Sequence, residues 1–433
     1  TIGLGNKEFF VASDAMALHK VAHEFIYLEE GDISELTLEQ LNIYDKNGTN
    51  VTRIVHSRPL HYEAADKGSY RHFMQKEIFA QTEAISDTLS GRLHKGAILE
   101  QAFGVEAAAI FAQTKHVSLV ACGSSYHACL VARYWLESIA GIACSVEIAS
   151  EFRYRKRVIN PSTLFVAISQ SGETADTLAA LADIKNDTTG SYVGTLAICN
   201  VPESTLVRSV DLIMLTHAGP EIGVASTKAF ITQLVSLFML TIVLGQHNKL
   251  RSDQVAELVA QLMHLPQVID QYLKLDVKLK ALAQNFANNK HSLFLGRGIM
   301  YPIALEGALK LKEISYIYAE GYPAGELKHG PLALVDKDMP VVVLAPNDNL
   351  LAKLKSNIQE VDSRGGKLIV ITTKTTQIEP SDNIIVFEVP EVVNNLAPIA
   401  FVVPLQLLAY HVAVLKGTDV DQPRNLAKSV TVE

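Results

Sequence analysis

Residues 164–182 read LFVAISQSGETADTLAALA, which is an apolar run, a polar turn and a helical pattern in direct succession. The run 164–168 has the length and composition of a buried strand, while 175–182 places small and apolar residues at a helical period. The turn between them, 169–174, holds hydroxyl groups, an amide and a glycine. A buried strand that leads through a short turn into a helix is the repeating unit of an α/β fold with a parallel sheet.

The same alternation of strands and helices begins near Val117 and then occurs a second time. The segments that match are 116–120 with 291–295, 163–168 with 340–344, 194–198 with 366–370, and 225–240 with 396–414. Right-handed crossovers place helices on both faces of a parallel sheet. We therefore predict an α/β fold with two tandem doubly wound parallel sheets, preceded by a short β-rich segment. Ligands of such folds bind at the carboxyl ends of the strands.

A chain of 433 residues is too long for one ordinary core, so we expect several parts. The opening residues alternate β-prone runs with turns such as Asn47-Gly48. Because residue 1 is Thr and not Met, we expect a piece of a longer protein. The predicted parts are a β-rich end of another domain at 1–62, a linker with leading helices at 63–110, a first α/β domain at 111–270, a second at 271–418, and a tail at 419–433.

The composition of the chain restricts the classes of binding partner and the cellular compartment that we expect. The formal net charge is −8 and no cluster of Lys and Arg offsets it, so we expect no nucleic-acid partner. Four cysteines without a CxxC pair or nearby histidines at ligand spacing predict reduced core thiols and no metal site. With no basic and apolar leader at the start, we expect a cytoplasmic protein. The apolar stretches 230–244 and 399–415 are broken by residues such as Gln233 and Pro404, which favours buried core helices over membrane spans.

The turn after the strand at 164–168 is a candidate phosphate site. Backbone N–H groups and hydroxyls at a helix N-terminus bind anions, and a glycine lets the backbone approach closely. The candidate residues are Ser169, Gln170, Ser171 and Thr174, with Ser125 from the turn 123–125 on the same sheet edge. The alternative is that Ser171 or Thr174 only caps the helix. The equivalent turn of the second copy, 346–349, has no hydroxyls, so we expect only the first copy to hold phosphate.

A charged stripe marks the helix expected at 303–314. Glu306, Lys310 and Glu313 follow the spacing i, i+4 and i+7, and apolar residues fill most of the remaining surface. Buried charges are costly unless they pair with each other or line a polar cavity. The stripe is therefore either an acid–base site or a structural Glu–Lys pair.

Two more segments could bring a reactive group. His329 lies in the glycine-bracketed loop 325–331, where a His could exchange protons near neutral pH or simply be solvated. The tail 419–433 is polar, contains Pro423 and lacks a helical period. From its pattern alone, the tail is floppy and Lys428 is a solvated charge. If the apolar side chains of Leu426 and Val430 instead pack the tail over the site, we expect it to act as a lid.

Taken together, these segments resemble the glucosamine-6-phosphate synthase family, the isomerising glutamine:fructose-6-phosphate aminotransferases. The matching strings are 169–177, 224–230, 306–314, 324–331 and 421–433. The resemblance implies a glutaminase domain with an N-terminal cysteine nucleophile, followed by two sugar-isomerase (SIS) domains. No cysteine precedes Cys122 here, so residues 1–62 would be the closing strands of that glutaminase domain and glutamine hydrolysis by this chain is not expected.

The resemblance also implies a reaction and a role for each candidate residue. The reaction makes glucosamine 6-phosphate from fructose 6-phosphate and glutamine-derived ammonia, with no metal or organic cofactor. In the implied site, Ser169, Gln170, Ser171 and Thr174 bind phosphate, Ser125 and Val224 line the sugar, His329 opens the ring, Glu313 moves the proton between C1 and C2, Lys310 acts at the C1 hydroxyl, and Lys428 forms an imine at C2. The family is dimeric and shares the loop His between subunits, which would be His329 here.

Two other functions fit part of the pattern. A non-catalytic sugar-phosphate sensor would need the serine-rich turn but not Glu313, His329 or Lys428. A simple phosphosugar isomerase would need the turn and the charged stripe but not the long tail.

Overall fold

The structure is a computed structural model that describes residues 1–12, 18, 21–29, 31–57, 66–186 and 191–431. It divides into two compact units, Thr1–Ser69 and Tyr70–Glu433, which we describe separately. The expected boundary at 62/63 lies outside the described residues.

The first unit is antiparallel, as its alternating runs and turns predicted. One sheet has the order β2-β1-β3-β7 and the other the order β4-β5-β6. Their strands are β1 (Ile2–Leu4), β2 (Phe9–Val11), β3 (Glu24–Ile26), β4 (Ile33–Leu36), β5 (Leu41–Tyr44), β6 (Asn50–Val51) and β7 (Val55–Ser57). Between β5 and β6, Asp45 accepts hydrogen bonds from the N–H groups of Asn47 and Thr49 and so closes the turn that contains Gly48.

The second unit begins with helices and a short hairpin and continues into a five-stranded parallel sheet. The opening elements are α1 (Phe73–Phe79), α2 (Gln81–Leu89), β8 (Leu93–His94), β9 (Ala97–Ile98) and α3 (Ala107–Gln113). The sheet contains β10 (His116–Ala121), β11 (Ala143–Ile148), β12 (Thr163–Ser169), β13 (Tyr192–Cys199) and β14 (Leu212–Leu215). Its helices are α4 (Gly123–Trp135), α5 (Ala149–Phe152), α6 (Ala175–Lys185), α7 (Thr205–Arg208) and α8 (Lys228–Gln246).

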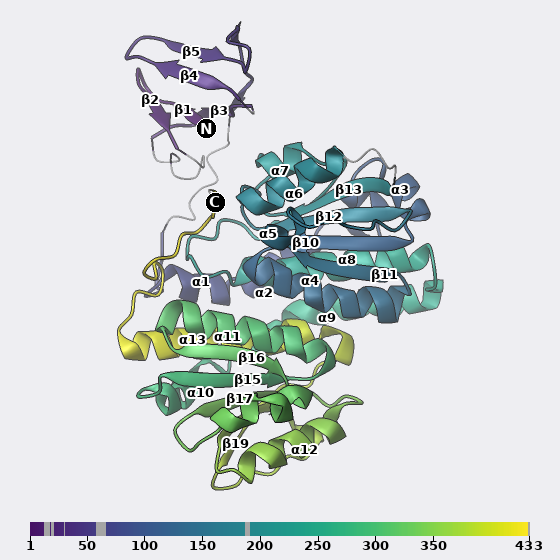
Figure 1. Cartoon of the computed structure of the whole chain (residues 1–433), viewed down its shortest axis with the longest axis vertical. Helices are drawn as coiled ribbons and strands as arrows, with labels where there is room; N and C mark the ends of the chain where they lie inside the picture. Colours follow the sequence, from purple (N-terminus) through teal and green to yellow (C-terminus); the bar gives the residue numbers. More distant parts are fainter. Residues whose placement is uncertain (13–17, 19–20, 30, 58–65, 187–190, 432–433) are drawn as a thin grey trace. The chain divides into compact units, whose positions relative to one another are not determined.

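A second five-stranded parallel sheet follows after the long helix α9 (Ser252–Leu273) and α10 (Asp276–Leu282). Its strands are β15 (His291–Gly296), β16 (Tyr318–Pro323), β17 (Pro340–Ala345), β18 (Lys367–Thr373) and β19 (Ile384–Val389). Its helices are α11 (Tyr301–Ser315), α12 (Leu351–Asp362) and α13 (Ala397–Lys416). Figure 1 shows the two sheets in succession along the vertical axis of this unit.

The two sheets share one topology, which confirms the prediction of two tandem doubly wound parallel sheets. The first has the order β11-β10-β12-β13-β14 and the second the order β16-β15-β17-β18-β19. In both, the chain reverses direction across the sheet between the first strand and the third, and ligands of such folds bind in the crevice at that point. In the first sheet this switch point lies between residues 122–125, where β10 leads into α4, and residues 169–174, where β12 leads into α6.

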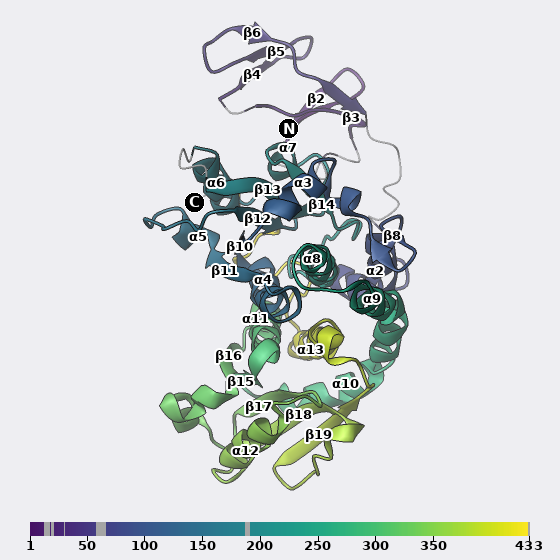
Figure 2. The same cartoon turned by 90° about the vertical axis from the view of Figure 1, so that its right-hand side faces the viewer.

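Helices α8 and α13 are apolar around their whole circumference because each is covered on every side. Figure 2 shows α4, α8, α11 and α13 in a layer between the two sheets. The apolar core is continuous across that layer. The rings of Trp135 in α4 and Phe238 in α8 meet edge to face, with 4.9 Å between their centroids. The indole N–H of Trp135 also donates to the Asn395 carbonyl of the second domain. Helices α8 and α13 are long and apolar enough to cross a membrane, but 94% of the most apolar stretch of α8 and 89% of that of α13 are buried inside the protein. They are core helices, as their interrupting polar residues indicated.

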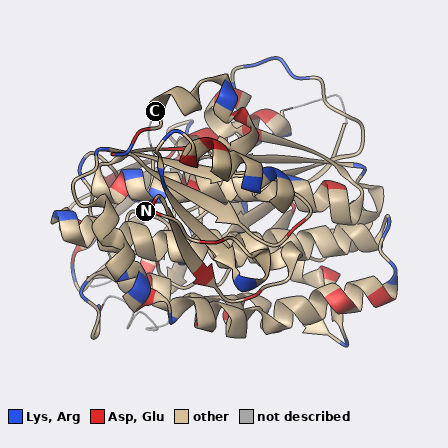
Figure 3. Cartoon of the chain, turned by 90° about the horizontal axis from the view of Figure 1, so that it is seen from below, with Lys and Arg blue, Asp and Glu red and all other residues tan. Residues whose placement is uncertain are grey.

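Basic and acidic residues are interspersed along the helices and loops in Figure 3. This agrees with a modest excess of acidic residues over basic ones in the sequence as a whole.

Candidate functional site

The turn after β12 is built by its own hydroxyl groups. Ser169 Oγ accepts a hydrogen bond from the Gly172 N–H at 3.0 Å and lies 3.2 Å from the hydroxyl of Thr174. Ser171 Oγ accepts from the Glu173 N–H at 3.2 Å. Thr174 is the N-cap of α6, but its side chain makes no capping bond. Among the described residues the hydroxyls therefore shape the turn, and simple helix capping does not account for them.

Glycine is required at residue 172. Its φ is +70°, and a Cβ placed there would lie 2.1 Å from the hydroxyl oxygen of Ser204. Glu173 fixes the same turn from the other side, because its carboxylate accepts the Thr205 N–H at 2.8 Å. The turn is thus held rigidly between β12, α6 and α7, which suits a cradle for an anion at the start of a helix.

The C-terminal tail contacts this turn directly. Ser429 Oγ lies 3.0 Å from Ser171 Oγ, and the Val430 carbonyl accepts the N–H of Ala175, the first residue of α6. In Figure 1 the yellow tail leaves α13, passes α1 and ends beside the first sheet. The expectation that Leu426 and Val430 pack the tail onto the site is wrong, since their side chains are 46% and 57% exposed. Val420 at the start of the tail is buried in the apolar core, and beyond it polar groups and the backbone hold the tail.

Lys428 is paired and is not a free surface charge. Its Nζ donates to Glu221 Oε2 at 2.7 Å and to the Gly223 carbonyl at 2.8 Å. Glu221 is fully buried, and its other oxygen accepts the N–H groups of Thr227 and Ala229 at the start of α8. Burial raises the pKa of Glu221, but the Lys428 charge and these hydrogen bonds outweigh burial and leave it below its usual value. Val224, in the same loop, donates its N–H to the Asp421 carbonyl at 3.0 Å.

The charged stripe lies on α11 as predicted and faces the first domain. Glu306 and Lys310 are fully buried, whereas Glu313 is 21% exposed at its side chain. Lys310 Nζ lies 2.5 Å from Glu313 Oε2 and 3.6 Å from Glu306 Oε1. Burial lowers the pKa of Lys310, but the charges of Glu313 and Glu306 outweigh burial and raise it above its usual value. Glu221 also acts on Lys310 electrostatically, so the stripe and the Lys428 pair share one electrostatic environment.

The first domain contacts the stripe through Ser124 and His127. Ser124 Oγ donates to Glu306 Oε1 at 2.9 Å and accepts from Lys310 Nζ at 3.2 Å. His127 Nδ1 lies 2.8 Å from Glu306 Oε2. Sequence reasoning chose Ser125, which is half-buried in the same turn, and missed these two residues. Their spacing of i, i+3 at the start of α4 was the available signal.

His329 stands apart from these groups. It ends the short helical turn Ala324–His329 after β16, and its side chain is exposed. Lys328 next to it pairs with Glu360 of α12 at 2.8 Å, which anchors the loop to the second domain. Among the described residues, no hydrogen bond or ion pair joins His329 to the stripe. Gln170 is half-buried in the serine-rich turn, where its carbonyl accepts the Asn200 N–H.

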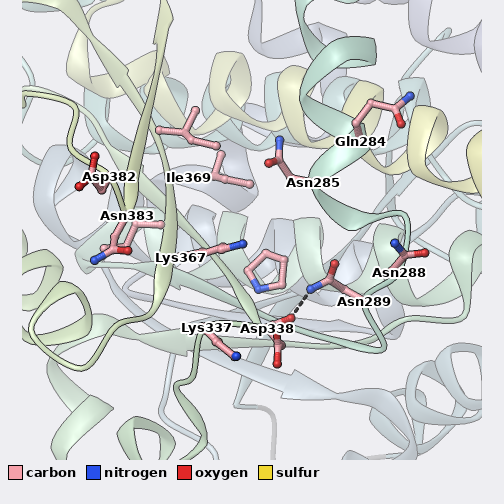
Figure 4. A pocket seen from close by; sticks show the side chains of 13 residues that line it. Gln284, Asn285, Asn288, Asn289, Lys337, Asp338, Lys367, Ile369, Asp382 and Asn383 are labelled. Carbon is pink, nitrogen blue, oxygen red and sulfur yellow. Dashed lines mark hydrogen bonds between the residues drawn. The ribbon is translucent and has the colours of Figure 1, made fainter.

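The second domain also has a hollow of about 590 Å³ at the edge of its sheet where the strands begin. Figure 4 shows its amide-rich lining, with Asn285, Asn289 and Lys367 around it and Asn289 bonded to the Asp338 carbonyl. This hollow lies at the amino ends of β17, β18 and β19, away from the carboxyl ends at which such folds bind ligands. Its size therefore does not make it the candidate site.

Comparison with known proteins agrees with this geometry. Residues 110–243 and 285–416 match the SIS domain family. Over all 433 residues the chain is 60% identical to the glutamine–fructose-6-phosphate aminotransferase [isomerizing] of Pseudomonas putida, of which it covers 70%. It is 56% identical over 432 residues to the Escherichia coli protein of the same name, again covering 70% of it.

Solved structures lead to the same family. The C-terminal domain of glucosamine-fructose-6-phosphate aminotransferase from Francisella tularensis superposes with a TM-score of 0.80 at 52% identity, covering 82% of this chain and 100% of that one. Tagatose-6-phosphate ketose/aldose isomerase from Escherichia coli has a TM-score of 0.65 at 18% identity, covering 82% and 97%, which shows a shared fold. With two SIS domains, a serine-rich turn and whole-length identity of this order, the chain belongs to the isomerizing glutamine–fructose-6-phosphate aminotransferases.

Proposed function

We propose that this chain converts fructose 6-phosphate and ammonia into glucosamine 6-phosphate, with ammonia derived from glutamine. The observation that carries the proposal is the position of Lys310. Its ammonium contacts Glu313 on the second domain and Ser124 in the first strand-to-helix turn of the first domain. The charged stripe of one domain thus contacts the topological switch point of the other, where ligands of such folds bind.

The proposed binding mode places the phosphate at the turn 169–174 and the sugar toward α11. Ser169, Gln170, Ser171 and Thr174 would supply neutral donors, and the start of α6 would supply a favourable dipole. Because the tail occupies the first N–H of α6 through the Val430 carbonyl, this part of the tail would have to shift when phosphate binds. Ser125 and Val224 would line the sugar.

The proposed chemistry begins with opening of the sugar ring by a His, followed by attack of the Lys428 amine on the C2 ketone. Water leaves and an imine forms; ammonia then displaces the lysine and leaves an imine at C2. Glu313 removes a proton from C1; the electrons of that C–H bond form a C1=C2 double bond, and the electrons of the C=N bond move onto the nitrogen, which takes up a proton to give an enaminol. Return of the proton to C2 and loss of the O1 proton yield the aldehyde of glucosamine 6-phosphate. Lys310 would assist at the C1 hydroxyl.

We propose that His329 acts from a second copy of the chain in a homodimer. Its exposure in the single chain and the anchoring of its loop by Lys328 support a role at a surface between subunits. We further propose that residues 1–62 are the closing part of a glutaminase domain and that residues 63–110 link this part to two SIS domains at 111–270 and 271–418. The tail 419–433 would cover the active site. We also propose that the protein is cytoplasmic. The absence of a cysteine before Cys122 supports the proposal that these 433 residues do not hydrolyse glutamine.

A non-catalytic sugar-phosphate sensor is a weaker alternative. A sensor has no use for a buried ammonium held between two carboxylates, nor for a second lysine delivered by a tail, and burying such charges is costly. A simple isomerase would not require the tail, and the direct contact of Ser429 with Ser171 favours a tail that takes part in the site.

The test is an isomerisation assay on the chain as it stands. We expect slow interconversion of fructose 6-phosphate and glucose 6-phosphate, formation of glucosamine 6-phosphate when ammonia is added, and no glutamate from glutamine. Borohydride reduction during turnover should attach the sugar to Lys428. A Lys428→Arg variant, which keeps the charge but cannot form an imine, should lose the adduct and the activity. Full activity of that variant, or an adduct on another lysine, would contradict the proposed role.

A further inference from the structure

Glu77 lies in α1, outside both segments that match the SIS family, yet it reaches the loop that holds Lys428. Only 3% of this residue is exposed. Its Oε1 accepts the N–H groups of Ile222 and Gly223 at 2.5 and 3.2 Å. The carbonyl of the same Gly223 accepts Lys428 Nζ at 2.8 Å. Glu77 and Lys428 therefore bind the same residue, Glu77 at the Gly223 N–H and Lys428 at the Gly223 carbonyl.

The second carboxylate oxygen of Glu77 makes no hydrogen bond to the described residues, although it is buried. It lies 2.9 Å from the point that a Cβ on Gly223 would occupy, which places it against the same glycine. A buried carboxylate with one oxygen unpaired is costly, and a side chain used only to hold two N–H groups would not need it.

The tail fixes the start of α1 as well. The two oxygens of Asp421 accept the N–H groups of Phe73 and Met74 at 2.9 and 3.0 Å, while the Asp421 carbonyl accepts the Val224 N–H. Glu77 of α1 thus binds the loop 221–224 at Ile222 and Gly223. The tail binds the same loop at Glu221 and Gly223 through Lys428 and at Val224 through Asp421. A shift of Glu77 would be transmitted to Lys428 through this short connection.

The charges that act on Glu77 come from each element packed around it. They are Glu221 in the loop, Lys428 in the tail and Lys228 at the start of α8. Burial raises the pKa of Glu77 to about 7, with Glu221 adding to the rise, while Lys428 and the two backbone N–H groups oppose it. Burial also lowers the pKa of Lys228, against the opposing charges of Glu221 and Glu77. Glu77 is therefore the carboxyl of this group that changes charge near neutral pH.

We propose that Glu77 is a positioning residue for the imine-forming lysine: it fixes the peptide that binds Lys428 and places a second negative charge beside the Lys428 ammonium. The inference rests on the proposed function, because it assigns Glu77 a part in that reaction. An added negative charge favours the ammonium over the neutral amine, and only the neutral amine attacks the ketone. Glu77 thus docks Lys428 through the Gly223 peptide, and removal of its negative charge should favour the neutral, nucleophilic amine.

The test compares Glu77→Gln and Glu77→Ala with the parent chain. Glutamine retains an acceptor for the Ile222 and Gly223 N–H groups but cannot ionise. The measurement is borohydride trapping of fructose 6-phosphate on Lys428, quantified by peptide mass spectrometry from about pH 6 to about pH 9. We expect the pH midpoint of trapping to fall by on the order of one unit in Glu77→Gln, with the affinity for fructose 6-phosphate unchanged. In Glu77→Ala, trapping should fall at every pH because the loop is no longer held.

Asp211→Asn serves as the matched control. Asp211 also holds a backbone N–H, that of Thr195, but on a distant part of the same domain. This variant should leave the trapping midpoint where it is. An unchanged midpoint in Glu77→Gln, with normal trapping in the parent chain, would overturn the role of Glu77 alone. A parent chain that isomerises no sugar and traps none on Lys428 would overturn the proposed function, and the inference with it.

Discussion

Replacing Glu221 with glutamine should loosen the C-terminal tail without unfolding the domain that holds it. The carboxylate is fully buried and binds three donors: Lys428 Nζ and the N–H groups of Thr227 and Ala229. The carbonyl oxygen of glutamine can still accept both backbone N–H groups, so the start of α8 should survive. The amide NH2 would instead face the ammonium of Lys428, which places donor against donor.

The size of the effect follows from the environment of the pair. A hydrogen bond to a charged group contributes about 1.5–3 kcal/mol. Lys428 is 26% exposed, so it can turn toward water and recover part of that loss. Ionised Glu77 would remain nearby as a counter-charge and reduce the loss again. We therefore expect the docked tail to lose about 2 kcal/mol, which raises the open population about thirtyfold.

Limited proteolysis measures that population directly. Arg424 and Lys428 are trypsin sites in the tail, and cleavage follows the open fraction when closing is faster than cutting. Cleavage at these sites should accelerate about thirtyfold in Glu221→Gln and still more in the double variant with Glu77→Gln, whereas Asp211→Asn should cut at the parent rate. A rate within about twofold of the parent chain would refute the reasoning, because the pair would then contribute almost nothing to docking.

Three further outcomes test other parts of the site. Gly172→Ala must move a Cβ away from the Ser204 hydroxyl at a φ of +70°, so it should cost about 2–5 kcal/mol and weaken calorimetric binding of fructose 6-phosphate; unchanged affinity would remove the turn from the site. Glu313→Gln should lower turnover about 10²–10⁴-fold with binding retained, and full activity would make the stripe structural. The folded-state pKa of Glu77, about 7, lies above its ordinary 4.5, so its stabilising contribution is complete below 4.5 and is lost as the pH rises through 7. Denaturation curves should accordingly show a loss of up to about 3 kcal/mol over that window that Glu77→Gln abolishes; an equal loss in both proteins would contradict the assignment.

The sequence was sufficient for the fold because its strands and helices are strongly periodic. The matched segments 163–168 and 340–344 became β12 and β17, which hold equivalent positions in the two sheets. The charged stripe could be placed on one face of α11 for the same reason. The roles assigned to the candidate residues, by contrast, stay predictions.

Contacts between residues far apart in the chain produce no periodic pattern in the sequence, so they could not be predicted in the same way. Glu77 and Glu221 are single acidic residues in unremarkable surroundings, and only the folded loop brings both to Lys428. The tail was expected to dock through Leu426 and Val430 because apolar side chains usually anchor a lid. Its attachment instead uses the buried Val420 at its start and then Asp421, Lys428 and the Val430 carbonyl, whose hydrogen-bond partners lie hundreds of residues away.

The continuous core between the two sheets has a consequence for biosynthesis. Helix α8 packs against the second half of the chain as well as its own sheet, so a nascent first half must hold a long apolar helix without its cover until α13 has been made. During that interval we expect chaperones to bind the exposed apolar surface of the partly synthesised protein. For the same reason, either half expressed separately should aggregate, although each has a complete five-stranded sheet.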